Sequence, residues 1–375
     1  MKWERCWCLG CALVVGVSLS CSKSTNLRCC EPQDHTERRS AVAPSYDVAI
    51  AHKKPLDIEP QKDVGKITSK NQATRQSGNG HILYTLTNDR AFRVEAKQGA
   101  RPRNISSAMN RLARGSGKDE YFSGSADGKW YVMASDRFGR DCKSWSCLSI
   151  VAADLSGGEA IRAGEKLIHP RGQMAVAKGA QFVVFADKGS SHELDLYVTT
   201  RTGRNWSKPK ALTHNSPYKW NDHPAISSDA SKIAFDCGPT PYSQEGTAIC
   251  EVGTDGNGLR IVLTPDFRPK DASKAKALHH PSYAPDGSIV FEGDWDGEQI
   301  WRLSKGSSVP VRIAPRFSND NSPCVLPDGR IVSLWLERSG GRGVHELKIM
   351  NPDGTKHLVL LPNVDVQDVG ISCGD

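Results

Sequence analysis

The chain has 375 residues, a formal net charge of +7 and an apolar content of 38%. Acidic and basic residues are interspersed and no basic stripe stands out, which argues against a nucleic-acid-binding protein. The 34 glycines and 21 prolines suit many short strands joined by turns. Together these features favour one large all-β domain with an appendage.

Residues 1–21 have the composition of an export signal. Lys2 and Arg5 precede an apolar run from Cys6 to Leu19. This run is too short to span a bilayer and is typical of the core of a signal peptide. The run ends in VSLSC, which resembles a bacterial lipobox, and this resemblance implies that Cys21 is lipidated and becomes the mature N-terminus. Because serine follows this cysteine, the resemblance to proteobacterial lipoproteins implies the outer membrane. An ordinary secretory signal cleaved nearby is the alternative.

Residues 22–76 are polar and show no sustained hydrophobic periodicity. Such a segment buries too little apolar surface to offset the entropy lost on ordering. We therefore expect a disordered, flexible tether between the membrane and a folded domain at residues 77–375.

One motif recurs along the rest of the chain. Its clearest copy is HPSYAPDGSIVFEGD, from His280 to Asp294, in which a turn separates two short apolar runs. In that turn Pro285 presets φ and Gly287 accepts a positive φ, so each copy predicts a β-hairpin. Six copies follow one another at intervals of roughly fifty residues. Their aligned turn residues are Asn79, Asp127, Lys178, Asp229, Asp286 and Asp328.

A second hairpin follows each copy, and four short strands per repeat are typical of a propeller blade. These repeats resemble the TolB-like, or PD40 (WD40-like), group of six-bladed propellers over about Gly78 to Asp375. The resemblance implies an all-β, six-bladed β-propeller with four-stranded antiparallel blades. The first copy lacks an inner strand, and Asp368 to Asp375 has the pattern of one. We expect this C-terminal strand to close the ring.

Eight of the twelve cysteines lie beyond residue 21, and an even number in an exported chain indicates disulfides rather than free thiols. Two pairs are close in the predicted hairpins, and a third would join the last blade to the first if the inner strands approach closely enough. The pattern leaves the state of Cys29 and Cys30 open. The expected pairs are Cys142–Cys147, Cys237–Cys250 and Cys324–Cys373.

A polar cluster precedes each predicted inner strand. If the blades are equivalent, these clusters converge at one mouth of the central channel, and converging loops on a rigid scaffold often carry function. Carboxylates gathered there favour a cation or a basic partner group. The alternative is that these residues only solvate the strand entrances; either way, we expect exposed side chains whose substitution changes stability by only about 0.5 kcal/mol. The candidate binding residues are Asp222, His223, His279, His280, Asp320 and Asp368.

The sequence contains no G-x-S-x-G, P-loop or H-E-x-x-H motif. We therefore expect a non-catalytic scaffold at the cell envelope that binds a protein, a peptide or a polar ligand, without metal or cofactor. The alternative is a metal-dependent carbohydrate lyase or hydrolase that uses the channel mouth, since oligogalacturonate lyases built on a similar propeller bind a metal through histidines. Only His223, His279 and His280 are available for that role.

Overall fold

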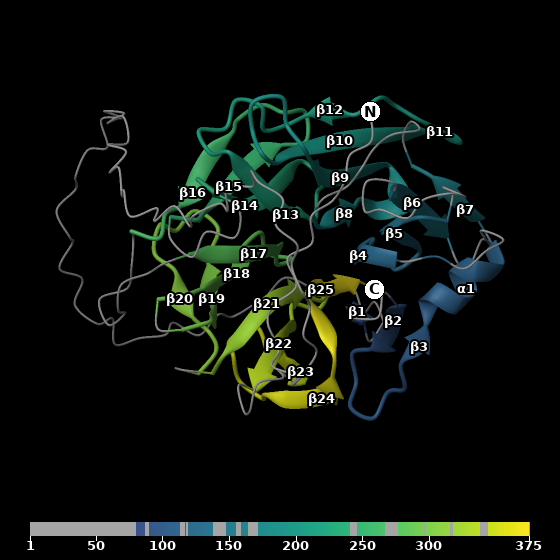
Figure 1. Ribbon diagram of the computed structural model, residues 1–375. Helices are drawn as coiled ribbons and strands as arrows, with labels where there is room; N and C mark the ends of the chain where they lie inside the picture. Colours follow the sequence, from purple (N-terminus) through teal and green to yellow (C-terminus); the bar gives the residue numbers. More distant parts are fainter. Residues whose placement is uncertain are drawn as a thin grey trace, which may run out of the picture. The chain divides into compact units, whose positions relative to one another are not determined.

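The computed structural model describes residues 80–86, 90–112, 117, 119–137, 148–154, 159–163, 172–240, 246–266, 277–295, 297–315, 318–337 and 344–374. The strands of these segments form six antiparallel sheets arranged as blades around a common axis (Figure 1). The predicted six-bladed β-propeller of four-stranded blades is confirmed. The expected leader with Cys21, the tether at 22–76 and the Cys142–Cys147 pair lie outside the described residues.

Blades are numbered here in chain order, and each is described from its inner strand outward. In blade 3 the outermost position is shared by two short strands that both pair with β10. Blade 1 contains β25 (Val366–Gly374), β1 (His81–Leu86), β2 (Arg90–Glu95) and β3 (Arg103–Asn104). Blade 2 contains β4 (Asp119–Gly124), β5 (Trp130–Ser135), β6 (Ser149–Asp154) and β7 (Glu159–Arg162). Blade 3 contains β8 (Met174–Val176), β9 (Phe182–Asp187), β10 (Asp195–Thr202), β11 (Asn205–Trp206) and β12 (Lys210–Ala211).

The other three blades are regular and follow the same order from the axis outward. Blade 4 contains β13 (Trp220–Ile226), β14 (Lys232–Gly238), β15 (Ala248–Gly253) and β16 (Arg260–Leu263). Blade 5 contains β17 (Leu278–Tyr283), β18 (Ile289–Gly293), β19 (Gln299–Leu303) and β20 (Val311–Arg312). Blade 6 contains β21 (Asp320–Val325), β22 (Ile331–Glu337), β23 (Val344–Met350) and β24 (Leu358–Val364).

The ring closes through β25, as the sequence predicted. This strand pairs antiparallel with β1, with His81 opposite Gly374 and Tyr84 opposite Ile371. On its other side, the Ser372 hydroxyl accepts a hydrogen bond from the Gly124 backbone N–H of β4 (3.2 Å). The first blade therefore takes its inner strand from the far end of the chain, and β1 has no open edge toward the axis.

The core consists of six clusters of buried apolar side chains, one at each junction between neighbouring blades. At the junction of blades 6 and 1, for example, Leu326 and Leu347 pack with Ile82. Since both faces of a blade are covered, a central strand is apolar on both faces, and every residue of β5 is buried. This explains why the repeats read as apolar runs with only weak alternation.

One helix departs from the all-β prediction. α1 (Ile105–Leu112) follows β3, and Ile105 and Met109 of this helix are buried. Asn104 caps it, because its Oδ1 accepts a hydrogen bond from the Ser107 backbone N–H (2.9 Å). The helix is short, and the hairpin periodicity that surrounds it in the sequence conceals its signal.

Two disulfides occur in the described part of the chain. Cys237 on β14 pairs with Cys250 on β15 (Cα–Cα 6.0 Å), and Cys324 on β21 pairs with Cys373 on β25 (Cα–Cα 5.5 Å). The second pair shows that the inner strands of blades 6 and 1 come close enough for a disulfide at this level of the ring.

Each of these disulfides is expected to stabilise the fold. Replacing Cys237 by serine, with Cys250 also replaced to avoid a free thiol, should lower the free energy of unfolding by about 2–4 kcal/mol in urea titrations. Mass mapping of non-reduced peptides is the direct measurement. Free thiols at positions 237 and 250 in protein purified without reductant would contradict the expectation.

Candidate functional site

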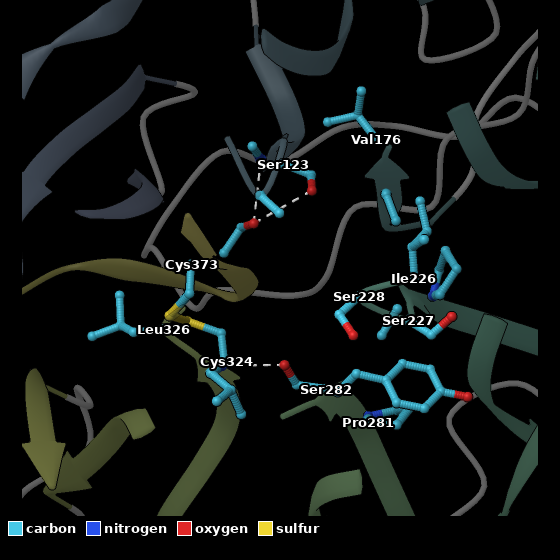
Figure 2. Close-up of a pocket in the computed structure, with 18 of the residues that line it drawn as sticks. Ser123, Val176, Ile226, Ser227, Ser228, Pro281, Ser282, Cys324, Leu326 and Cys373 are labelled. Atoms are coloured by element: carbon cyan, nitrogen blue, oxygen red, sulfur yellow. Dashed lines mark hydrogen bonds between the residues drawn. A yellow bond between two sulfur atoms is a disulfide. The ribbon is translucent and has the colours of Figure 1, made fainter. Parts of the chain in front are cut away.

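The inner strands of all six blades line a central cavity of about 380 Å³ (Figure 2). At one end the lining residues belong to the turns between the first and second strands, and Ser228, Pro285 and Pro327 there are exposed. At the other end Ser322 is buried and His280 is mostly buried. The named lining residues are thus exposed at the turn end and mostly buried at the end where the inner strands begin.

A β-bulge is repeated near the start of the inner strands. In β13 the register shifts between Asp222 and Ala225, and in β17 it shifts between His279 and Ser282. His223 and His280 occupy these bulges with positive φ (51° each), a conformation that is uncommon for residues other than glycine. In each case the following residue is a proline. Proline has no backbone N–H, but the bulge already interrupts the hydrogen bonds between the strands there, so no hydrogen bond is lost.

The bulges of blades 4 and 5 bring histidines and carboxylates together. His223 Nδ1 lies 2.7 Å from Asp236 Oδ1, and His279 Nδ1 lies 3.2 Å from Asp236 Oδ2. His280 Nδ1 lies 2.9 Å from Glu292 Oε2. The rings of His223 and His280 are also in contact, with centroids 4.2 Å apart.

A third carboxylate, that of Asp222, completes the group. It accepts hydrogen bonds from the backbone N–H of His223 (2.7 Å) and from that of Gln173. The chain passes so close that a Cβ at Gly172 would clash with the Asp222 carboxylate. We call the following six residues the histidine–carboxylate cluster: Asp222, His223, Asp236, His279, His280 and Glu292.

Burial and charge fix the protonation of this cluster. Burial disfavours the imidazolium of His223, but the carboxylates of Asp236 and Asp222 outweigh it and raise the His223 pKa to about 9. Burial, together with repulsion from His223, lowers the pKa of His280. Burial raises the pKa of Asp222 to about 6, although His223 opposes the shift. At neutral pH, His223 is therefore charged and His280 neutral.

The cluster is acidic overall. It holds three carboxylates, and no lysine or arginine pairs with them within the described part of the chain. Burial opposes protonation of His279, but its hydrogen bond to Asp236 raises its pKa. Even with His223 and His279 both protonated, the carboxylates outnumber the cations by one. Among the described residues, no group of three or more ligating side chains is placed to hold a metal ion.

The structure gathers four of the six predicted site residues, namely Asp222, His223, His279 and His280. Asp320 lies elsewhere: its carboxylate accepts a hydrogen bond from the Ser333 hydroxyl (3.1 Å) and lies 4.0 Å from Lys348 Nζ. The residue that matches Asp222 in blade 6 is Asn321, so Asp320 is one position away, on the opposite face of the strand. Asp368 falls within β25, and its side chain lies outside the described residues.

Two expectations about these residues were wrong. The polar residues lie inside the inner strands rather than before them, because the proline that suggested a strand start marks a bulge. They are also not exposed, since Asp222 and His223 are at most 8% exposed. The acidic residue at the start of the inner strand of blade 2, Asp119, is also buried. It forms an ion pair with Arg137 (2.7 Å) in which both side chains are fully buried, so its role is structural.

Sequence reasoning missed Asp236 and Glu292, the carboxylates that orient the histidines. They occupy the same register position on the second strands of blades 4 and 5, opposite Asp222 and His279. The available signal was an acidic residue directly after the apolar runs IAF and IVF, where a buried strand predicts another apolar side chain.

The raised pKa of His223 predicts how stability depends on pH. A histidine with a folded pKa of about 9 and an unfolded pKa of about 6.5 stabilises the fold fully below pH 6.5. This contribution is lost as the pH rises toward 9, at a rate of at most about 1.4 kcal/mol per pH unit. Urea unfolding between pH 7 and 9.5 should show the decline, and His223→Gln should flatten it. A wild-type protein whose stability is constant over this range would contradict the assignment.

Solved structures confirm the fold at low sequence identity. TolB from Acinetobacter baumannii superposes with a TM-score of 0.56 at 17% identity, covering 79% of this chain and 66% of that one. A putative TolB from Agrobacterium tumefaciens gives a TM-score of 0.52 at 14% identity, covering 77% of this chain and 90% of that one. A chain of the nidogen/laminin complex gives a TM-score of 0.54 at 10% identity, covering 79% of this chain and 98% of that one. The predicted likeness to TolB propellers therefore holds for the fold.

Comparisons by sequence add little. No family model matches the chain. The pyruvate dehydrogenase E1 component of Escherichia coli (strain K12) is 27% identical over an alignment of 115 residues, and the match covers 28% of this chain and 12% of that protein. The chain thus spans about an eighth of that relative, too little to carry over an activity. Within the described part of the chain, no helix is long and apolar enough to cross a membrane.

Proposed function

We propose that this protein is an exported, non-catalytic binding scaffold and that its partner, an envelope protein or peptide, inserts part of itself into the central cavity. The observation that carries the proposal is a cavity of about 380 Å³ that ends on a buried, charged cluster. Ligand sites are commonly concave, mostly apolar and fitted with a few convergent polar groups, with volumes of roughly 300–1,000 Å³. The TolB and nidogen propellers are similar in fold, and the proposal does not depend on their partners.

Two matched variants of the full chain test the site of binding. In the first, Ser228→Trp narrows the exposed end of the cavity, and in the second, Val311→Asp alters the exposed outer strand of blade 5. Both positions are exposed, so we expect stability changes of only about 0.5 kcal/mol. Affinity capture from an envelope extract should recover the partner with wild-type protein and with Val311→Asp, but not with Ser228→Trp. The reverse pattern would place the function on the outer surface of the blades.

We also propose that the mature protein is lipid-anchored through Cys21 in the outer membrane, on its periplasmic or surface side, as the VSLSC motif suggests. Cells grown with a radiolabelled fatty acid should label the protein, and Cys21→Ala should abolish the label. If the wild-type protein carries no label, the leader is an ordinary secretory signal. If the label persists in Cys21→Ala, another residue is lipidated, and either result disproves the anchor at Cys21.

A metal-dependent carbohydrate lyase or hydrolase is the second candidate. The observation in its favour is the pairing of His223 and His280 with carboxylates beside the cavity, since a carboxylate-paired histidine is suited to general acid–base chemistry. The placement of the described residues does not favour metal binding. Release of unsaturated products from polyuronates by purified protein, with and without added Mn²⁺, would support this candidate over the scaffold.

A further inference from the structure

The two disulfides in the described part of the chain have different surroundings. Cys237 and Cys250 link the second and third strands of blade 4, and both residues are at most 1% exposed. Cys324 and Cys373 link the inner strands of blades 6 and 1, and both line the central cavity (Figure 2). Cys324 is 6% exposed and Cys373 is more exposed than that. We call these pairs the blade 4 disulfide, which is shielded, and the cavity disulfide, which a solute in the cavity can contact.

The cavity disulfide lies toward the turn end of the ring. Cys324 is the second-last residue of β21, and the turn that follows contains Pro327, which lines the cavity and is exposed. Cys373 lies opposite Ile82, the second residue of β1. Both cysteines are therefore at the end where the named lining residues are exposed. A small solute reaches them there without passing the buried histidine–carboxylate cluster.

The cavity disulfide takes the place of a connection that the other blades have. In blades 2 to 6 a turn joins the inner strand to the second strand, and a backbone hydrogen bond closes each turn. In blade 5, for example, the Gly287 N–H donates to the Ala284 carbonyl (2.9 Å). No turn joins β25 to β1, because these strands come from opposite ends of the described chain. Cys373 is near the end of β25, where such a turn would begin, and its bond to Cys324 ties this end to blade 6.

Non-covalent contacts alone would hold residues 371–374 if the disulfide were broken. These residues pair with β1, and the Ser372 hydroxyl accepts the hydrogen bond from the Gly124 N–H (3.2 Å). The register between β25 and β1 shifts between Tyr84 and Leu86, so an irregularity separates this paired segment from the rest of the strand. A short paired segment that no turn connects to its partner opens at a lower free-energy cost than a strand of a hairpin.

We propose that the cavity disulfide is a redox latch on the ring. A small thiol that enters the cavity reduces it in the folded protein, and residues 371–374 then separate from β1 more often than in the oxidised protein. Ile371, Ser372 and Cys373 line the cavity, so this opening enlarges the cavity at its wall. The blade 4 disulfide stays oxidised under the same conditions. The inference goes beyond the proposed function, because it holds whether or not a partner enters the cavity.

The reaction is a thiol–disulfide exchange with a low-molecular-weight thiol as the reductant. A thiolate of the reductant attacks the sulfur of Cys373, the more exposed cysteine, and Cys324 leaves as a thiolate that takes up a proton. A second thiolate attacks the mixed disulfide and releases Cys373, which is also protonated, while the reductant departs as its own disulfide. The protein gains two electrons and two protons. Exposed disulfides are generally the labile and regulatory ones, which is why we assign this role to the cavity disulfide.

Timed reduction of the folded, full chain tests whether the two disulfides differ. The protein is treated with dithiothreitol at pH 8, and portions are quenched with excess iodoacetamide. Trypsin places the four cysteines on peptides 317–330, 357–375 and 233–260, the last of which carries both cysteines of the blade 4 disulfide. Mass spectrometry then gives the alkylated fraction of each pair. We expect the cavity disulfide to react at least about tenfold faster, because the blade 4 disulfide reacts only when the fold opens.

The same reaction in urea above the unfolding transition is the control for intrinsic reactivity. Both disulfides are then equally accessible, so the difference between their rates should disappear. Equal rates in the folded protein would overturn the inference. A folded protein in which neither disulfide reacts would also overturn it.

Hydrogen exchange tests whether the bond acts as a latch. With dithiothreitol present, the backbone amides of residues 371–374 should exchange at least about tenfold faster than in the oxidised protein. Cys324→Ser combined with Cys373→Ser should give the same increase without reductant. The matched control, Cys237→Ser combined with Cys250→Ser, should leave the exchange of residues 371–374 unchanged. Equally slow exchange of these residues in the oxidised and reduced wild-type protein would show that the disulfide is no latch, and this comparison needs no variant to fold.

Discussion

Replacing His223 by alanine is expected to lower the free energy of unfolding by about 3–5 kcal/mol, the usual cost of removing one partner from a buried ion pair. The imidazole of His223 lies closest to the carboxylate of Asp236, a residue that is 1% exposed, and supplies its counter-charge. The backbone N–H of His223 also donates a hydrogen bond to the carboxylate of Asp222. Without it, two buried carboxylates face each other with only His279 to balance them. Chemical denaturation at pH 7 is the measurement.

The matched control is His214→Ala, because His214 is exposed and forms no hydrogen bond in the described structure. This variant should unfold within about 0.5 kcal/mol of wild type. An effect of His223→Ala as small as that of the control would show that the cluster is hydrated and not a buried ionic group.

Deleting residues 366–375 is expected to abolish cooperative unfolding or to cause aggregation. The deletion removes β25, the hydrogen-bonded partner of β1, and with it the Cys324–Cys373 disulfide. Blade 1 would keep three strands, and the ring would gain an open edge on β1, a template for pairing with other chains. Thermal unfolding followed by circular dichroism, together with light scattering, reports both outcomes.

Cys373→Ser separates the strand from the disulfide. This variant keeps β25 and should still unfold cooperatively, with a loss limited to the contribution of one disulfide, about 2–4 kcal/mol. A truncated protein with the thermal stability of wild type would show that β25 does not close the ring.

The fold could be predicted because its signal is repeated. A Pro-Asp-Gly turn between two apolar runs, as at Pro285, is weak evidence once but strong evidence when it recurs at a constant interval. Closure of the ring could be predicted because the first repeat has no inner strand of its own and the C-terminal residues have the pattern of one. α1 was missed because it occurs in one blade only and no other repeat supports it.

The site was only partly predictable because its geometry depends on register. His223 and His280 attracted attention as histidines before prolines, but the sequence does not say that each sits in a bulge. A shift of one residue moves a strand side chain to the opposite face, and this is why Asp320 was grouped with Asp222 although it faces Ser333. Asp236 and Glu292 belong to the cluster only through pairing across strands, and no local pattern encodes that.

The pairing of β1 with β25 also has a consequence for how the protein is made. β1 is the first described strand to be synthesised, and its inner neighbour is synthesised after all the others. Throughout elongation the nascent blade 1 therefore has an unfilled position next to the axis, and its last contacts form between segments at the greatest separation along the chain. Such long-range pairing is slow and leaves strand edges open to wrong partners. Blade 1 can therefore be completed only after the strands of all the other blades have been made.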